Sequence, residues 1–228
     1  MRERQIAIVT GAGTGVGKAI TRALMDSGFL VVMTGRRAAV LEAANAELGG
    51  GGVVLPADAS IPAEVDALFE TVAARFGRVD LLVNNAGMSA PPVPVDELDV
   101  DIWHQVVAAN LTSAFLCTRA AFRQMKAQSP QGGRIINNGS ISATTPRPNS
   151  APYTATKHAI TRVMSLAALP MSIWPQAMLN GRPSSAEDLV SPVMACLVAV
   201  YGAELGRGVV ADIEPLLMIR LPWGDCAF

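Results

Sequence analysis

The sequence predicts one α/β domain with a doubly wound parallel sheet, and three observations support this prediction. Apolar runs rich in β-branched residues alternate with segments of helical periodicity over about residues 1–168. Each run is apolar throughout, which is typical of strands that helices cover on both faces. The first run is followed at once by a glycine cluster and a helical segment. The 228 residues suit a single domain, residues 1–228, with a sizeable core.

The first third of the chain contains most of the expected sheet. Strands are predicted at residues 6–10, 30–34, 53–56 and 79–83, and helices at residues 18–27, 38–48 and 63–76. Four glycines at 49–52 precede the third strand and indicate a turn there. This order of elements predicts that each strand is joined to the next by a helix that crosses the sheet.

The same alternation continues toward the C-terminus. A long helix is expected from about residue 101 to 127, a fifth strand at 134–138, and a further helix from about 152 to 169. Pro152 suits the first turn of that last helix, because proline has no N–H and the first turn needs none.

Composition limits the classes of function that fit. Half of the residues are hydrophobic, only 16% are charged, and the mean hydropathy is +0.34, as expected for a compact globular chain. The net charge is −1, with 18 basic and 19 acidic residues and no basic block. Such a chain has no electrostatic footprint for nucleic acid or an anionic membrane, so a small-molecule partner is favoured.

Cysteines, histidines and hydropathy give further expectations. Cys117, Cys196 and Cys226 are odd in number and irregularly spaced, which predicts reduced thiols and a cytoplasmic location. His104 and His158 lack partners at ligand spacing, so no metal site is expected. The N-terminus has no signal-peptide core, and no apolar run is long enough to span a membrane.

The glycine cluster Thr10-Gly-Ala-Gly-Thr-Gly-Val-Gly17 lies between the first strand and the first helix. Small residues there let backbone amides approach a phosphate, whose charge the start of a helix favours. A tight turn would explain the glycines alone. The strand before and the helix after favour a dinucleotide site of the Rossmann type, in which Gly11 and Gly17 are the first and third glycines and Gly15 lies between them.

The end of the second predicted strand, Thr34-Gly-Arg36-Arg37, bears on the choice of cofactor. Sites for NAD usually place a carboxylate here, about twenty residues after the glycine loop, to bind the ribose 2′-hydroxyl. Two cations stand in its place, which favours a 2′-phosphate and hence NADP(H) over NAD(H). The alternative is that the arginines cover the adenine or are solvated.

Tyr153 and Lys157 are four residues apart in a predicted helix, so they share one face. A neighbouring ammonium lowers the pKa of a phenol, which normally titrates near 10, and so prepares it for acid/base work. Ser140 precedes the tyrosine by thirteen residues. By itself the pair is weak evidence, since such spacing is common on helix surfaces.

Taken together, the motifs resemble the short-chain dehydrogenase/reductase family. Asn84-Asn85-Ala86-Gly87, Asn110, Ser140, Tyr153 and Lys157 follow the glycine loop in that family's order, over residues 1 to about 168. The resemblance implies an oxidoreductase that transfers a hydride between NADP(H) or NAD(H) and an alcohol or carbonyl substrate. It also implies a homodimer or homotetramer. A non-catalytic nucleotide-binding regulator or subunit of the same fold is the alternative.

The resemblance also implies roles for individual residues. Tyr153 would be the acid/base, Lys157 would bind the nicotinamide ribose, Ser140 would donate to the substrate oxygen, and Asn110 would hold a water of a proton relay. Asp58 would touch the adenine, and Asn84 would stabilise the sheet. The full set implied to bind the cofactor is Gly11, Thr14, Gly15, Val16, Gly17, Arg36, Arg37, Asp58, Ala59, Asn85, Ala86, Gly87, Tyr153 and Lys157.

After about residue 168 the chain departs from the family pattern. Pro170 and Pro175 leave no room for a buried central strand, so the expected sixth strand and substrate lid are missing or rebuilt. A late helix is expected at 184–201 and a last strand at 206–212, while the tail 214–228 matches nothing. Either a shortened connection leaves the substrate site open, or a partner subunit holds the region. An incomplete or rearranged family member is a third alternative, and the substrate is not identified.

Overall fold

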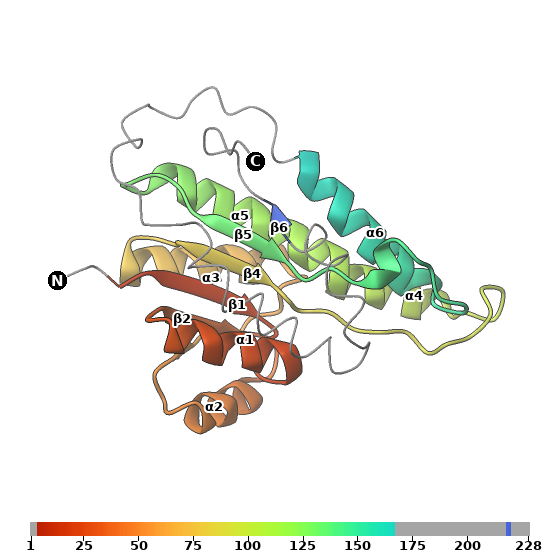
Figure 1. The fold of residues 1–228 in the computed structure, drawn as a ribbon, viewed down its shortest axis with the longest axis horizontal. Helices are drawn as coiled ribbons and strands as arrows, with labels where there is room; N and C mark the ends of the chain where they lie inside the picture. Colours follow the sequence, from red (N-terminus) through yellow and green to blue (C-terminus); the bar gives the residue numbers. More distant parts are fainter. Residues whose placement is uncertain (1–3, 167–217, 220–228) are drawn as a thin grey trace, which may run out of the picture.

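The computed structural model describes residues 4–166 and Met218–Ile219. Within these residues the strands form one sheet in the order β3-β2-β1-β4-β5-β6 (Figure 1). The strands are β1 (Ile6–Thr10), β2 (Leu30–Thr34), β3 (Val53–Val54), β4 (Leu81–Asn84), β5 (Arg134–Asn137) and β6 (Met218–Ile219). The helices are α1 (Gly15–Asp26), α2 (Ala38–Glu47), α3 (Pro62–Phe76), α4 (Val100–Val107), α5 (Ser113–Ala127) and α6 (Ala151–Leu166), with the short turns η1 (Ala108–Thr112) and η2 (Ile141–Ala143).

The first five strands are parallel, which confirms the predicted doubly wound sheet. β1 lies between β2 and β4, with Ile8 opposite both Val32 and Leu82. The strand order reverses direction next to β1, and open α/β sheets bind ligands at such a switch point, beyond the carboxyl ends of the strands. The predicted binding residues follow these carboxyl ends.

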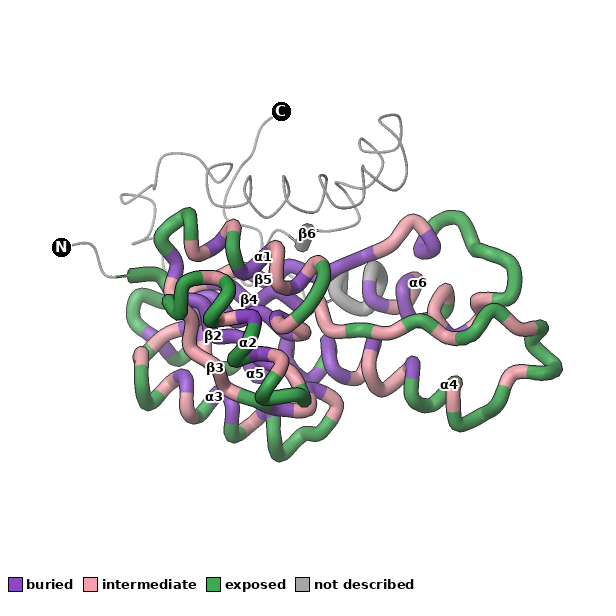
Figure 2. The backbone as a smooth tube through the Cα atoms, turned by 90° about the horizontal axis from the view of Figure 1, so that it is seen from below, coloured by how far each residue is buried: buried purple, intermediate pink, exposed green. Residues whose placement is uncertain are grey.

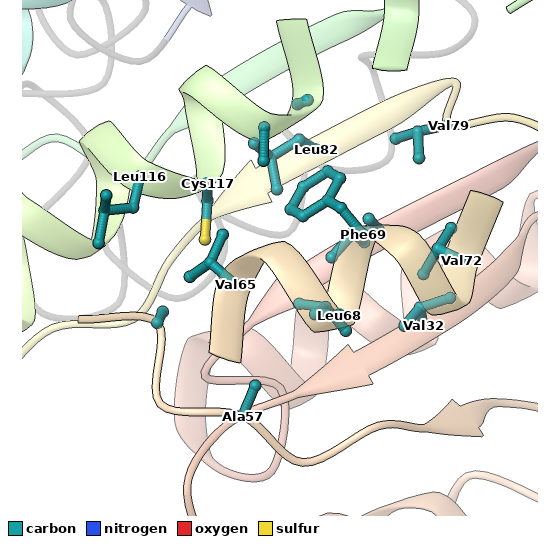
Figure 3. Close-up of a cluster of buried hydrophobic side chains, with 14 of the residues drawn as sticks. Val32, Ala57, Val65, Leu68, Phe69, Val72, Val79, Leu82, Leu116 and Cys117 are labelled. Carbon is teal, nitrogen blue, oxygen red and sulfur yellow. The ribbon is translucent and has the colours of Figure 1, made fainter. Parts of the chain in front are cut away.

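The core consists of two apolar layers, one on each face of the sheet. Alternate residues of a strand point to opposite faces, so Ile8 packs with α3 and α5, while Val9 packs with α1 and α2. Figure 3 shows the first layer, where Phe69 and Val72 of α3 lie against the strands and Cys117 of α5 closes the far side. Burial of the Cys117 thiol raises its pKa to about 12, which keeps it protonated and unreactive.

Three predicted elements differ from the structure. The third strand is shorter than expected, since only Val53–Val54 pairs with β2. The helix expected from about residue 101 to 127 contains a π-helical turn, Ala108–Thr112, in which Ser113 N donates to Ala108 O, five residues back. The first helix begins at Gly15 rather than at residue 18, so it starts inside the glycine loop.

β6 is the unexpected element. Met218 and Ile219 pair with Ile136 and Ile135 of β5 in the antiparallel sense. They lie in the tail that the sequence left unassigned, and they add an antiparallel strand to an otherwise parallel sheet. The other predictions for this part of the chain, namely the altered sixth strand and lid, the helix at 184–201 and the strand at 206–212, lie outside the described residues.

Exposed residues lie on the outer faces of α2 and α3 and in the loops beside α4, whereas most strand residues are buried. Figure 2 shows buried strands in the middle and exposed chain extending past α4 and α6. No helix among the described residues is long and apolar enough to cross a membrane.

Candidate active site

The glycine loop brings the first turn of α1 into direct contact with the end of β1. Gly11 and Gly15 have positive φ angles of 64° and 50°, which residues with a side chain rarely adopt. A Cβ at Gly17 would lie only 2.1 Å from the carbonyl oxygen of Gly11. Thr14 is exposed at the N-cap of α1 and Val16 packs on the second core layer. The backbone is thus tightly folded at a helix N-terminus, as a phosphate cradle requires.

A hydroxyl ties this loop to the Asn84–Gly87 segment. Thr10 Oγ1 accepts from the backbone N–H groups of both Asn85 and Ala86, at 2.9 Å each. The Asn85 side chain returns the contact by donating from Nδ2 to Thr10 O at 3.0 Å. The carboxyl ends of β1 and β4 are therefore held together by reciprocal hydrogen bonds.

Arg36, Arg37 and Asp58 lie at the outer end of this edge, after β2 and β3. Both arginines are exposed, and Ala59 beside Asp58 belongs to the buried core. Burial by itself raises the pKa of Asp58, but hydrogen bonds from the Ser60 hydroxyl and amide and the charge of Arg36 outweigh it and lower that pKa. A cation and a carboxylate thus lie within electrostatic reach of each other where a ribose would be bound.

Asn110 is buried at the π turn between α4 and α5. Its Oδ1 accepts from Met88 N at 2.7 Å, and its Nδ2 donates to Met88 O at 3.0 Å and to Thr156 Oγ1 at 3.2 Å. Both amide hydrogens are therefore in use, and the side chain joins the loop after β4 to α6. The predicted relay water would have to bind the backbone carbonyl of Asn110.

Ser140 lies at the N-cap of η2, directly after β5. Its Oγ accepts from Ser142 N at 3.2 Å. That bond leaves the hydroxyl hydrogen available to a substrate oxygen, and it orients the group through the short helical turn that follows.

Tyr153 and Lys157 lie on the first two turns of α6. The Lys157 Nζ lies 5.6 Å from the centroid of the Tyr153 ring, within the range of a cation–π contact. Lys157 is 5% exposed, and its Nζ donates to the backbone carbonyl of Asn138 at 2.6 Å. Burial lowers the pKa of Lys157 to about 8, because desolvation disfavours the ammonium.

Asn84 has the structural role that the sequence predicted. Its Nδ2 donates to Asn137 Oδ1 at 2.8 Å and to Thr118 Oγ1 at 3.0 Å, so it joins β4 to β5 and to α5.

Three further residues, whose role was not predicted from the sequence, link the predicted residues to one another: Thr10, Asn138 and Thr156. Asn138 Nδ2 donates to Asn85 Oδ1 at 3.0 Å, and Thr156 accepts from Asn110. A polar residue that ends an otherwise apolar strand was the available sign for Thr10 and Asn138, since such a group needs a partner when it is buried.

The predicted residues thus gather along one edge of the sheet, with Gly11, Asn85, Ser140 and Lys157 following β1, β4, β5 and the start of α6. Trp103 and His104 lie exposed on α4 and take no part. Among the described residues, no group of three or more histidine, cysteine or carboxylate side chains lies where it could hold a metal ion.

Comparison with known proteins is consistent with this geometry. Residues 5–174 match the family model for short chain dehydrogenase, which is well over half of the chain. The chain belongs to the short-chain dehydrogenase family. A 3beta-hydroxysteroid dehydrogenase from Mediterraneibacter gnavus is 37% identical over 170 residues, 73% of this chain. The chain spans about 60% of the length of that curated relative.

Solved structures of the family confirm the Rossmann-type fold. The 3-ketoacyl-(acyl-carrier-protein) reductase from Brucella melitensis, complexed with NADH, is 34% identical with a TM-score of 0.69, over 73% of this chain and 69% of that one. A metagenomic short-chain oxidoreductase in complex with NADP is 36% identical with a TM-score of 0.67, over 72% and 75% of the two chains. The resemblance stated from the motifs is therefore confirmed.

Proposed function

We propose that this short-chain dehydrogenase is an oxidoreductase that interconverts an alcohol and a carbonyl with a nicotinamide cofactor, using Tyr153 as the acid/base. The observation that carries the proposal is the buried Lys157 ammonium over the Tyr153 ring, on the same sheet edge as the glycine loop. A pure nucleotide-binding protein has no need of a buried cation beside a phenol.

The residues present fit a dinucleotide. The close approach of Gly17 to Gly11 leaves no space for a Cβ, so the backbone amides of the loop and of the first turn of α1 are open to a pyrophosphate. Arg36 and Arg37, exposed after β2, would bind a ribose 2′-phosphate, which supports NADP(H) over NAD(H). Asp58 and Ala59 would line the adenine, and Ala86 and Gly87 would present backbone to the middle of the cofactor.

The chemistry divides between cofactor and protein. The nicotinamide supplies or accepts the hydride, which is the step the side chains of the protein cannot perform. Tyr153 donates its hydroxyl proton to the substrate oxygen during reduction and takes a proton back during oxidation. Ser140 donates a hydrogen bond to that oxygen and so stabilises the negative charge that develops on it.

Lys157 supplies electrostatic support. Among the ion pairs of residues 4–166 none involves Lys157, so no described carboxylate neutralises the ammonium that lies over the Tyr153 ring. The backbone carbonyl of Asn110 would hold the water through which Lys157 exchanges its proton with solvent. A homodimer or homotetramer remains a prediction. It is supported by three exposed apolar side chains on α4 and α5, Val100, Trp103 and Phe115.

The test is cofactor turnover by the purified chain over a panel of ketones and secondary alcohols with NADPH, NADH and their oxidised forms. Tyr153→Phe should lower kcat by about 10²–10⁴-fold, because it removes the proton donor, while cofactor affinity falls far less, since the glycine loop and Lys157 remain. Tyr201→Phe, which removes the only other phenol of the chain, is the matched control and should keep full activity. Tight cofactor binding without turnover on any substrate would favour the non-catalytic alternative, and equal activity of Tyr153→Phe would refute the assigned chemistry.

A further inference from the structure

The Lys157 ammonium is held by Asn138, the residue that directly follows β5. Lys157 Nζ donates to its backbone carbonyl at 2.6 Å. The N–H of Asn138 in turn donates to Asn84 O at 2.9 Å, which extends the β4–β5 pairing one residue beyond the strand. The acceptor of the ammonium is therefore a backbone group held in place by the sheet.

The Asn138 side chain adds a second restraint. At 7% exposure an amide in this position needs hydrogen-bond partners to offset its desolvation. Its Nδ2 donates to Asn85 Oδ1 at 3.0 Å, and Asn85 Nδ2 donates to Thr10 O at 3.0 Å. A continuous run of hydrogen bonds thus leads from Lys157 through Asn138 and Asn85 to Thr10, at the start of the glycine loop.

The donor and acceptor roles in this run of hydrogen bonds fix the orientation of the Asn85 amide. Asn85 uses its nitrogen on Thr10 and its oxygen on Asn138, so rotating the Asn85 amide by 180° would break both bonds. An apolar side chain at position 138 would fill the same space without fixing either neighbour. The amide is therefore better explained by positioning than by packing.

We propose that Asn138 is a positioning residue that fixes the ammonium of Lys157 relative to the glycine loop, and so sets the charge beside Tyr153 in register with the bound dinucleotide. The inference rests on the proposed function for its catalytic meaning, whereas the positioning itself is measurable without turnover. Asn138 does not touch the substrate; it acts through Lys157.

The experiment titrates Lys157 directly in the cofactor-free protein. The chain has three lysines, Lys18, Lys126 and Lys157, so carbon-13 labelling of the lysine ε-carbon gives three NMR signals to follow with pH. Asn138→Leu keeps the branching and the number of heavy atoms but removes the amide, so the carbonyl that binds the ammonium is held less firmly. We expect the titration midpoint of Lys157 to fall by about half a unit to one unit, with those of Lys18 and Lys126 unchanged.

The matched control is Asn137→Leu, the same change at the neighbouring buried position, whose amide oxygen accepts from Asn84 rather than contacting Asn85. It should lower the melting temperature but leave the Lys157 midpoint in place. Asn138→Gln, which keeps an amide, should restore most of the wild-type value. If Asn138→Leu does not fold, Asn138→Ser, too short to reach Asn85, is judged by the same criteria.

A Lys157 titration in Asn138→Leu, or in Asn138→Ser where the leucine variant does not fold, that superimposes on the wild type would overturn the proposal. So would an equal shift in Asn137→Leu, because the effect would then come from a loosened strand. In turnover assays the limb of the kcat profile that reports Lys157 should move with the NMR midpoint, and kcat should fall more than the KM for cofactor rises. A wild-type chain without any turnover would refute the proposed function and leave the NMR outcome to decide on positioning.

Discussion

The two ends of the candidate site hold their shape by opposite means. At the carboxyl end of β1, the geometry depends on side chains that are missing, since Gly11 and Gly17 let two stretches of backbone touch. At the carboxyl ends of β4 and β5 it depends on side chains that are present, because Asn85, Asn110 and Asn138 join loops to one another. The first arrangement suits a ligand bound by backbone amides, and the second suits a charge that must be placed accurately.

The largest effect is expected at Gly17, at the end of the site that depends on missing side chains. Gly17→Ala would force a Cβ against the Gly11 carbonyl, so we expect a loss of about 4 kcal/mol in unfolding free energy and loss of cofactor binding. Urea denaturation and cofactor titration measure the two effects. Gly13→Ala is the control in the same loop, since its Cβ would lie 3.0 Å from Val40 Cγ1, a contact that a shift of a few tenths of an ångström relieves, and it should cost clearly less than Gly17→Ala. Equal losses in both variants would contradict the close-contact explanation.

Lys157→Met tests the end of the site at β4 and β5, where side-chain amides hold the structure. It should raise the unfolding free energy, whereas Gly17→Ala should lower it. The folded pKa of Lys157, about 8, is below its ordinary value of 10.5, so at pH 7 the native state keeps a charge it disfavours. We expect the variant to be more stable at pH 7 by up to about 3 kcal/mol and its activity to fall at least about 100-fold.

The stability difference between the wild type and Lys157→Met should depend on pH. Between about pH 8 and 10.5 the unfolded chain holds more protons at this lysine than the folded chain, so the wild type gains stability as pH rises. The stability difference from Lys157→Met should therefore shrink across this window. Denaturant unfolding of both proteins at pH 7, 8.5 and 10 measures it, and the Cys117 contribution cancels because both carry that thiol. A difference independent of pH would show that the lysine is not buried as described.

Thr10→Val tests the link between the two ends. The change keeps the shape but removes the acceptor of the Asn85 and Ala86 N–H groups, so we expect a loss of about 2 kcal/mol in unfolding free energy. Thr10→Ser keeps the hydroxyl and should cost less than half as much. Thermal and urea unfolding of the pair decide, and equal losses would assign the effect to the missing methyl group instead.

The smallest expected effect is at Arg36, outside both arrangements. Arg36→Ala should weaken NADP(H) binding by about tenfold and leave NAD(H) binding and the melting temperature unchanged, because the exposed guanidinium would contact only the 2′-phosphate. Arg75→Ala, an exposed arginine at the end of α3, is the control. If both cofactors weaken equally, Arg36 covers the adenine and does not select the phosphate.

Much of the site could be predicted because its motifs are local. The glycine loop, Asn84–Gly87 and the Tyr153–Lys157 pair each lie within a few residues of one strand end or one helix, and the order of strands brings the strand ends together. The contacts of Asn110 and Asn138 could not be predicted in this way. Their partners are 22 residues away at Met88, 46 at Thr156 and 53 at Asn85, and no spacing rule connects them.

The sequence by itself determined the doubly wound sheet, and it predicted the phosphate loop and the Tyr153–Lys157 pair, because strand periodicity, glycine clusters and helical spacing are properties of short segments. Only the tertiary structure decided that Lys157 is buried and held by Asn138, that both amide hydrogens of Asn110 are in use, and that Met218–Ile219 pairs antiparallel with β5. Burial and long-range hydrogen bonds depend on which segments meet in space. The identity of Tyr153 and Lys157 can therefore be predicted from the sequence, whereas the position and burial of the lysine charge depend on the fold.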